Sequence, residues 1–232
     1  MRVRCTATLV LTLALAPQGA RAVQIFTVES GSASPDGYRL KVEMVMDAPP
    51  AAIRDVLLNI CDYREQIPYL EICEVVRVEG KTAWSYSYVD APVLAPRDYT
   101  IARTVETDLA PDGTGTLRIT WHEDAQHGPP PREGVVRLRL NSGSWTIRPH
   151  DDGKRSRVSY QLRMTPGGNI PAWVARHVQQ RTMPTSMALI EESAQRKARS
   201  GKVLVPGDEH PWAPVKQGPT PPTISEAPSA HR

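Results

Sequence analysis

Two histidines and two acidic residues lie within the six positions from His122 to His127, and these residue types bind divalent metal ions. A zinc-protease helix carries its histidines four positions apart on one helical face. The position four residues after His122 is Gln126, and His127 precedes a stretch of prolines that is typical of a loop. The sequence therefore predicts no metal site.

Nucleophilic and acid–base chemistry have no matching pattern either. Ser144 stands between Gly143 and Trp145, which departs from the G-x-S-x-G turn of serine hydrolases. The acids at positions 98, 151 and 152 are typical of turns and surfaces, so no general acid–base pair stands out. The turn at residues 166–168 precedes a helix and could bind an anion there, although a plain turn is the simpler interpretation. We predict no catalytic residue and no cofactor.

Aromatic residues with polar tips provide a different kind of candidate site. Tyr and Trp side chains can bury an apolar ligand and orient it through a hydroxyl or an indole N–H. Six of them recur on the predicted strands: Trp84, Tyr86, Tyr88, Tyr99, Trp121 and Tyr160. We expect them to line the concave, covered face of a sheet, where ordinary core packing is the alternative role. Arg103 shares one side of its strand with Tyr99.

The elements that must hold these residues are mainly strands. In residues 38–46, apolar side chains alternate with polar ones: Tyr38, Leu40, Val42, Met44 and Met46. We expect further strands at residues 73–78, 81–89, 97–106, 115–123, 135–140, 144–148 and 157–164. A short amphipathic helix at residues 47–60 separates the first strand from the second. One-sided alternation predicts an antiparallel sheet with a single covered face.

One long helix follows the strands: after the turn at residues 166–168 it is expected to begin at residues 169–171 and to run to about residue 199. Its apolar stripe consists of Trp173, Val174, His177, Val178, Met187, Ile190 and Ala194. We expect this helix to cover the sheet in an α+β fold, and Pro184 to kink it because proline removes a backbone donor. Basic residues at its end complement the helix dipole or, alternatively, contact a membrane surface: Arg196, Lys197, Arg199 and Lys202.

The two ends of the chain differ in composition from the middle. Residues 1–22 combine a basic start, an apolar stretch and an A-x-A site ending at Ala22, which predicts a cleaved signal peptide and a periplasmic or secreted protein. Residues 23–37 form a short lead-in, residues 38–200 the folded domain, and residues 201–232 a Pro-rich tail that we expect to be disordered. The predicted signal peptide holds three of the 28 basic residues and none of the 25 acidic ones, so the remaining chain is formally neutral. A nucleic-acid binder is normally basic, so that class is not indicated.

Two cysteines, Cys61 and Cys73, lie outside the predicted signal peptide. An oxidising compartment permits a disulfide between them, and two buried thiols are the alternative. Two cysteines alone do not make a metal site.

Four short motifs resemble the START (StAR-related lipid-transfer) domain. They are Arg97-Asp98-Tyr99, PPREG at residues 130–134, Ser144-Trp145 and PGGNIPAW at residues 166–173. APP at residues 48–50, followed by a short helix and Asp62-Tyr63, resembles the wider helix-grip (polyketide cyclase/Bet v 1-like, SRPBCC) superfamily. The resemblance implies a curved antiparallel sheet wrapped around a long C-terminal helix, with an internal hydrophobic cavity between them.

The resemblance also implies a ligand, a lipid or another hydrophobic small molecule held for sequestration or transfer without catalysis. Trp173 and His177 would then face the cavity. Arg103 matches an arginine that points into the cavity in some START domains, where it would anchor a ligand hydroxyl or carboxylate; reaching solvent at a strand end is the alternative. We expect the ligand to enter between the helix and the loops at residues 91–96 and 127–131, and a monomer that contacts membranes transiently. A cyclase-like enzyme and a solidly packed interaction module are the alternatives.

Overall fold

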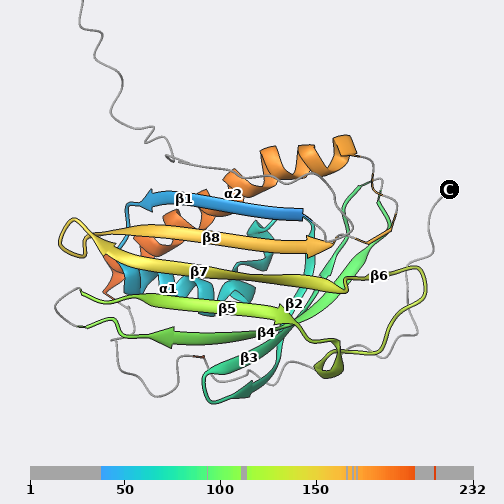
Figure 1. Cartoon of the computed structure of the whole chain (residues 1–232), viewed down its shortest axis with the longest axis horizontal. Coiled ribbons are helices and arrows are strands. Elements are labelled where there is room, and N and C mark those ends of the chain that lie inside the picture. Colours follow the sequence, from blue (N-terminus) through green and yellow to red (C-terminus); the bar gives the residue numbers. More distant parts are fainter. Residues whose placement is uncertain are drawn as a thin grey trace, which may run out of the picture.

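The computed structural model describes residues 38–92, 94–110, 114–165, 167–168, 170, 172–201 and 212 (Figure 1). In chain order the elements are β1 (Tyr38–Met46), α1 (Pro50–Leu58), η1 (Ile60–Gln66), β2 (Leu70–Glu79), β3 (Thr82–Val89), β4 (Arg97–Thr107), β5 (Leu117–Glu123), η2 (Ala125–His127), β6 (Val136–Arg137), β7 (Leu140–His150), β8 (Arg155–Thr165) and α2 (Ala172–Ser200). The predicted signal peptide and lead-in lie outside the described residues, as do the side chains of Trp173 and His177. None of the described helices is both long and apolar enough to cross a membrane.

The strands form one curved sheet in the order β1-β8-β7-β5-β4-β3-β2, and every pair along this path is antiparallel. The short strand β6 adds a parallel contact to β4. Both α-helices lie on the same side of the sheet (Figure 1). This arrangement confirms the predicted α+β class and the helix-grip fold.

The hydrophobic core lies between the sheet and these helices, where the one-sided alternation predicts it. Four side chains of β1 and three of α2 belong to this core: Leu40, Val42, Met44, Met46, Met187, Ile190 and Ala194. Each of them is at most 5% exposed. The apolar stripe expected for the second half of the long helix is thereby confirmed.

The long helix is one element rather than two. It runs from Ala172 to Ser200 with Pro184 inside it, close to the predicted bounds. A hinge at Pro184 stays a prediction.

The single strand expected at residues 135–140 is divided, and this expectation is wrong. Arg137 donates from Nε and Nη2 to the two carboxylate oxygens of Asp98, at 2.7 and 2.8 Å. The backbone N–H of Leu138 donates to the carbonyl oxygen of Asp98 at 2.9 Å. These contacts hold the segment beside β4, so β7 begins only at Leu140.

Two further contacts join distant parts of the chain. Cys61 of η1 and Cys73 of β2 form a disulfide, which is one of the two alternatives that the sequence leaves open. Trp212 falls in the predicted disordered tail, yet it is 5% exposed and packs in the core. The expectation of disorder is therefore wrong at this residue. A single indole ring buries a large apolar area by itself, so it can join a core without a periodic pattern of apolar residues around it in the sequence.

Candidate ligand-binding site

A cavity of about 480 Å³ lies between the concave face of the sheet and α2. Its walls are mostly apolar and come from all parts of the domain, for example Leu40 of β1, Leu57 of α1, Ile119 of β5, Leu162 of β8 and Ile190 of α2. A volume of this size is typical of small-molecule sites. The described part of the chain is therefore not a solidly packed module.

The cavity reaches the surface beside the segment that joins η1 to β2. Ile67, Pro68 and Tyr69 line it there, and Tyr69 is 46% exposed, so this segment forms the rim. Leu94 lines the cavity from the loop that precedes β4, which is one of the two loops predicted to flank the ligand's entry. The other predicted loop, at residues 127–131, contributes none of the described lining residues.

Arg103 on β4 is the buried cation of this cavity. Its side chain lines the cavity although the residue is only 6% exposed. Nη1 donates to the carbonyl oxygen of Leu57 at 3.0 Å, whereas Nε and Nη2 have no hydrogen-bond partner among the described residues. Burial lowers the pKa of Arg103 to about 10, although nearby Tyr99 opposes the shift. Arg103 is therefore charged at neutral pH and does not reach solvent at a strand end.

The Nε and Nη2 atoms that lack a partner in Arg103 are both hydrogen-bonded in another arginine of this protein, Arg137. Arg137 uses its Nε and Nη2 as a fork for the two oxygens of Asp98, which is the arrangement that guanidinium groups favour with carboxylates. The same two atoms of Arg103 are buried and have no acceptor among the described residues, and Arg103 is a lining residue of the cavity. No acidic side chain is among the described residues that line the cavity, so a ligand must supply any anion.

Three of the predicted aromatic residues line the cavity: Tyr99, Trp121 and Tyr160. Trp121 and Tyr160 stack with their ring centroids 5.7 Å apart, and Trp121 donates from Nε1 to Oδ1 of Asn141 at 3.0 Å. Burial raises the pKa of Tyr99 and of Tyr160, so both hydroxyls stay protonated. These residues form a rigid wall with few free polar groups.

Among the lining residues absent from the predicted site, Trp145 and Asn141 carry polar groups. The ring centroid of Trp145 lies 4.4 Å from that of Tyr160. Alternation with the buried Ile147 was the signal that places Trp145 inward. Asn141 had no comparable signal, because a lone amide does not mark a face.

Trp84, Tyr86 and Tyr88 do not line the cavity, and this part of the predicted site is wrong. They pair with Ala102, Thr100 and Asp98 of β4, and directly paired residues share a face of the sheet. Tyr99 and Arg103 point into the cavity, so the residues that alternate with them point away. The inward face of β3 carries small side chains instead: Ala83, Ser85 and Ser87.

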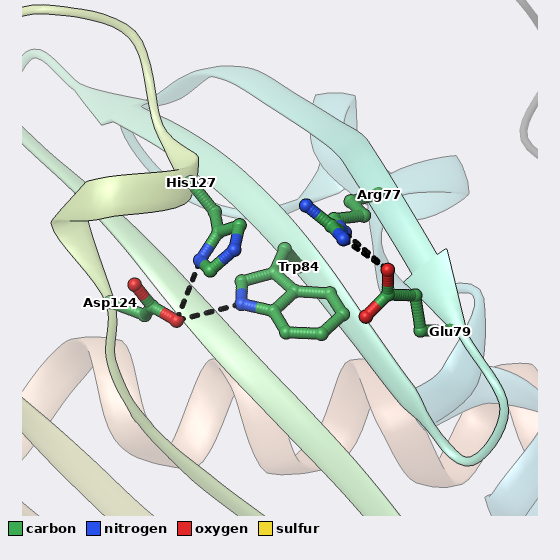
Figure 2. A network of polar contacts seen from close by, with 5 residues as sticks. All are labelled: Arg77, Glu79, Trp84, Asp124 and His127. Atoms are coloured by element: carbon green, nitrogen blue, oxygen red, sulfur yellow. Dashed lines mark hydrogen bonds and ion pairs between the residues drawn. The ribbon is translucent and has the colours of Figure 1, made fainter.

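On the outer face these aromatic residues enter polar contacts with the covering loops. Figure 2 shows Asp124 accepting a hydrogen bond from Nε1 of Trp84 at 2.8 Å, with Nδ1 of His127 2.9 Å from the same oxygen. Burial opposes ionisation of Asp124, but these two hydrogen bonds outweigh it and lower the pKa of the carboxyl. Arg77, paired with Glu79, covers the Trp84 ring from the other side (Figure 2). No group of three potential metal ligands occurs within the described residues.

The fold and the cavity define a helix-grip domain that can enclose an apolar small molecule. A family model described as the START domain matches residues 23–194. The chain therefore belongs to the START domain family.

Comparisons with individual proteins agree with this assignment. A StAR-related lipid transfer protein fragment from Xanthomonas axonopodis is 22% identical, with a TM-score of 0.58 over 72% of this chain and 98% of that one. Human STARD10 is 20% identical, with a TM-score of 0.60 over 75% of this chain and 71% of that one. These likenesses show the fold.

A curated relative in sequence is an uncharacterised protein of Pseudomonas aeruginosa. It is 32% identical over 119 residues, which are 49% of this chain and 55% of the relative. The match thus spans little more than half the length of that relative.

Proposed function

We propose that the protein is an exported, monomeric binding domain that holds an amphipathic lipid with an acidic head group, for sequestration or transfer and without catalysis. One observation carries the proposal: the charged Arg103 lines an apolar cavity, and its Nε and Nη2 have no acceptor among the described residues. Leaving such a cation without an acceptor is costly. A ligand carboxylate would satisfy it as Asp98 satisfies Arg137.

The remainder of the cavity suits an acyl chain. Each methylene that moves from water into an apolar site contributes about 0.8 kcal/mol. The apolar walls would supply most of the affinity in this way, while Arg103 would select the head group and fix the direction in which the chain lies.

Membrane contact during lipid exchange is proposed at the rim of the cavity. Tyr69 is the most exposed large apolar side chain there. The basic end of α2 is a weaker candidate because neither Arg196, Lys197 nor Arg199 is among the described residues that line the cavity. In addition, Arg196 already lies 4.0 Å from Glu192. The basic residues at this end of α2 therefore fit the role of complementing the helix dipole.

Export rests on the composition of residues 1–22. The disulfide between Cys61 and Cys73 supports it, because such bonds persist in oxidising compartments. N-terminal sequencing of the protein from its own cells tests the proposal: a mature chain that begins at Val23 is expected, and a retained Met1 would contradict it.

Displacement of a fluorescent fatty acid, cis-parinaric acid, tests the ligand class. Oleate and oleyl alcohol have matched chains and differ only in the head group. We expect oleate to displace the probe at lower concentration than oleyl alcohol does. Displacement by both ligands at the same concentration would contradict selection of an acidic head group. A protein that does not bind the probe at all would contradict lipid binding.

A further inference from the structure

Trp212 packs against the folded domain, although it lies beyond the end of α2 in the sequence. It follows the end of α2 by about a dozen positions, a length of chain that reaches up to about 40 Å when extended. Its side chain is buried in the same core as β1 and α2. The tail therefore contributes one core residue to the domain.

The partner of Trp212 is the buried cation of the cavity. Cζ of Arg103 lies 5.0 Å from the centroid of the Trp212 ring, within the range of a cation–π contact. Such a contact is stronger when both groups are shielded from water, and these residues are 6% and 5% exposed. The indole thus compensates in part for the missing counter-charge.

The contact leaves the hydrogen-bonding edge of Arg103 available. An indole covers the flat face of a guanidinium, whereas the N–H donors point outward in the guanidinium plane. Nη1 donates to the carbonyl oxygen of Leu57, whereas Nε and Nη2 have no hydrogen-bond partner among the described residues. Trp212 itself is not among the described residues that line the cavity.

A hydrogen bond does not explain the place of Trp212. Its Nε1 is buried and has no hydrogen-bond partner among the described residues, although buried indole N–H groups usually find one. The contacts that hold the ring are therefore apolar packing and the Arg103 face.

We propose that Trp212 is a positioning residue for Arg103: its indole holds the guanidinium in the wall of the cavity and so sets the preference for an acidic head group. The proposal rests on the proposed function, because it concerns the selectivity of that same site.

The test compares oleate with oleyl alcohol in the full chain and in two variants. Trp212→Leu removes the aromatic face and keeps an apolar side chain, and Trp212→Phe restores a smaller aromatic face. We expect Trp212→Leu to reduce the preference for oleate at least about fivefold, since a desolvated cation–π contact is lost. Affinity for oleyl alcohol should change little, and Trp212→Phe should recover part of the preference.

The possible outcomes separate the two proposals. If Trp212 only fills the core, Trp212→Leu would lower the affinity for both ligands equally or leave both affinities unchanged. Either result would overturn the inference while the wild-type preference for oleate stands. A wild-type protein with no such preference would contradict the proposed function, and the inference with it.

A measurement on the wild-type protein covers the case in which Trp212→Leu does not fold. The Nε–H proton resonance of Arg103, assigned by its loss in Arg103→Met, should be displaced upfield by the indole ring current. An ordinary arginine shift would show that the ring does not cover the guanidinium and would overturn the inference.

Discussion

Replacing Arg103 with methionine should separate ligand recognition from stability. Methionine fills a similar unbranched volume but has neither charge nor donors. We expect Arg103→Met to lose most of its affinity for oleate while the domain stays folded with nearly unchanged stability. The two effects differ because the cation has an unfilled edge in the unliganded protein.

The effect on stability follows from three opposing contributions. Burial lowers the pKa of Arg103 from its ordinary value to about 10, which corresponds to roughly 3 kcal/mol of destabilisation at about 1.4 kcal/mol per pKa unit. The charged hydrogen bond to Leu57 offsets about 2 kcal/mol of this, and the contact with Trp212 about 1 to 2 kcal/mol. The sum is close to zero, so the free energy of unfolding should change by no more than about 1 kcal/mol.

The loss of binding free energy should be larger than the change in stability, because no favourable contribution opposes it. Removing one partner of a buried, hydrogen-bonded charge pair costs about 2 to 5 kcal/mol, so the dissociation constant for oleate should rise at least about 30-fold. Oleyl alcohol, which has no charge to lose, should bind within about threefold of its wild-type affinity.

The pH dependence follows from the lowered pKa. Arg103 stays protonated below about pH 10, so oleate affinity should be constant from pH 7 to 9 and fall above pH 10. Because the pKa of the folded state lies below that of the unfolded state, the unfavourable contribution to stability is constant at neutral pH and diminishes only above about pH 10.

Isothermal titration calorimetry and urea unfolding measure the two quantities in parallel. Arg97→Met is the matched control, since Arg97 also lines the cavity but is partly exposed and hydrogen-bonds to the carbonyl oxygen of Ala95. The control should lose little oleate affinity. The reasoning fails if Arg103→Met binds oleate as the wild type does, or if it loses about 3 kcal/mol of stability, which would make the cation structural.

Three further predictions concern the scaffold. Reduction of the Cys61–Cys73 disulfide, which closes a loop with a sequence separation of 12, should lower the free energy of unfolding by about 3 kcal/mol; identical urea curves with and without reductant would refute this. Gly143→Ala should destabilise by about 1 to 3 kcal/mol, because the added Cβ would overlap the carbonyl oxygen of Gln161 and the Trp121 ring; an unchanged unfolding midpoint would contradict the tight approach. Burial, with the adjacent Asp98 carboxylate, raises the pKa of Tyr86 to about 12, so the stability it contributes is present below pH 10 and lost between pH 10 and 12. Tyr86→Phe should therefore lose less stability across this range than the wild type, and equal slopes would argue against the assignment.

Much of the fold could be predicted from the sequence because its strands are buried on one face. The bounds of β1 agree with the predicted strand at residues 38–46. The stripe through Met187, Ile190 and Ala194 likewise faces the core. One-sided burial produces a periodic signal that needs no tertiary information.

The orientation of β3 could not be predicted in the same way. Alternation shows that Trp84, Tyr86 and Tyr88 share a face, but not which face lies toward the cavity. Both faces of this strand are covered, because loop residues such as Asp124 and His127 pack on the outer one. Aromatic residues therefore do not mark the cavity side here.

The surroundings of Arg103 were also beyond the sequence. Its contacts reach Leu57, 46 positions away, and Trp212, whose proline-rich neighbours carry no periodic signal. Long-range contacts between single residues depend on how elements pack, which composition and periodicity do not encode.

Nuclear magnetic resonance of oleate labelled with ¹³C at its carboxyl carbon tests the central claim most directly, since it observes the head group inside the cavity. The wild-type protein should give one bound resonance with the chemical shift of an ionised carboxylate, and this resonance should disappear in Arg103→Met. A bound resonance that is the same in both proteins, or no bound resonance in the wild type, would contradict the assignment of Arg103 as the anchor of an acidic lipid.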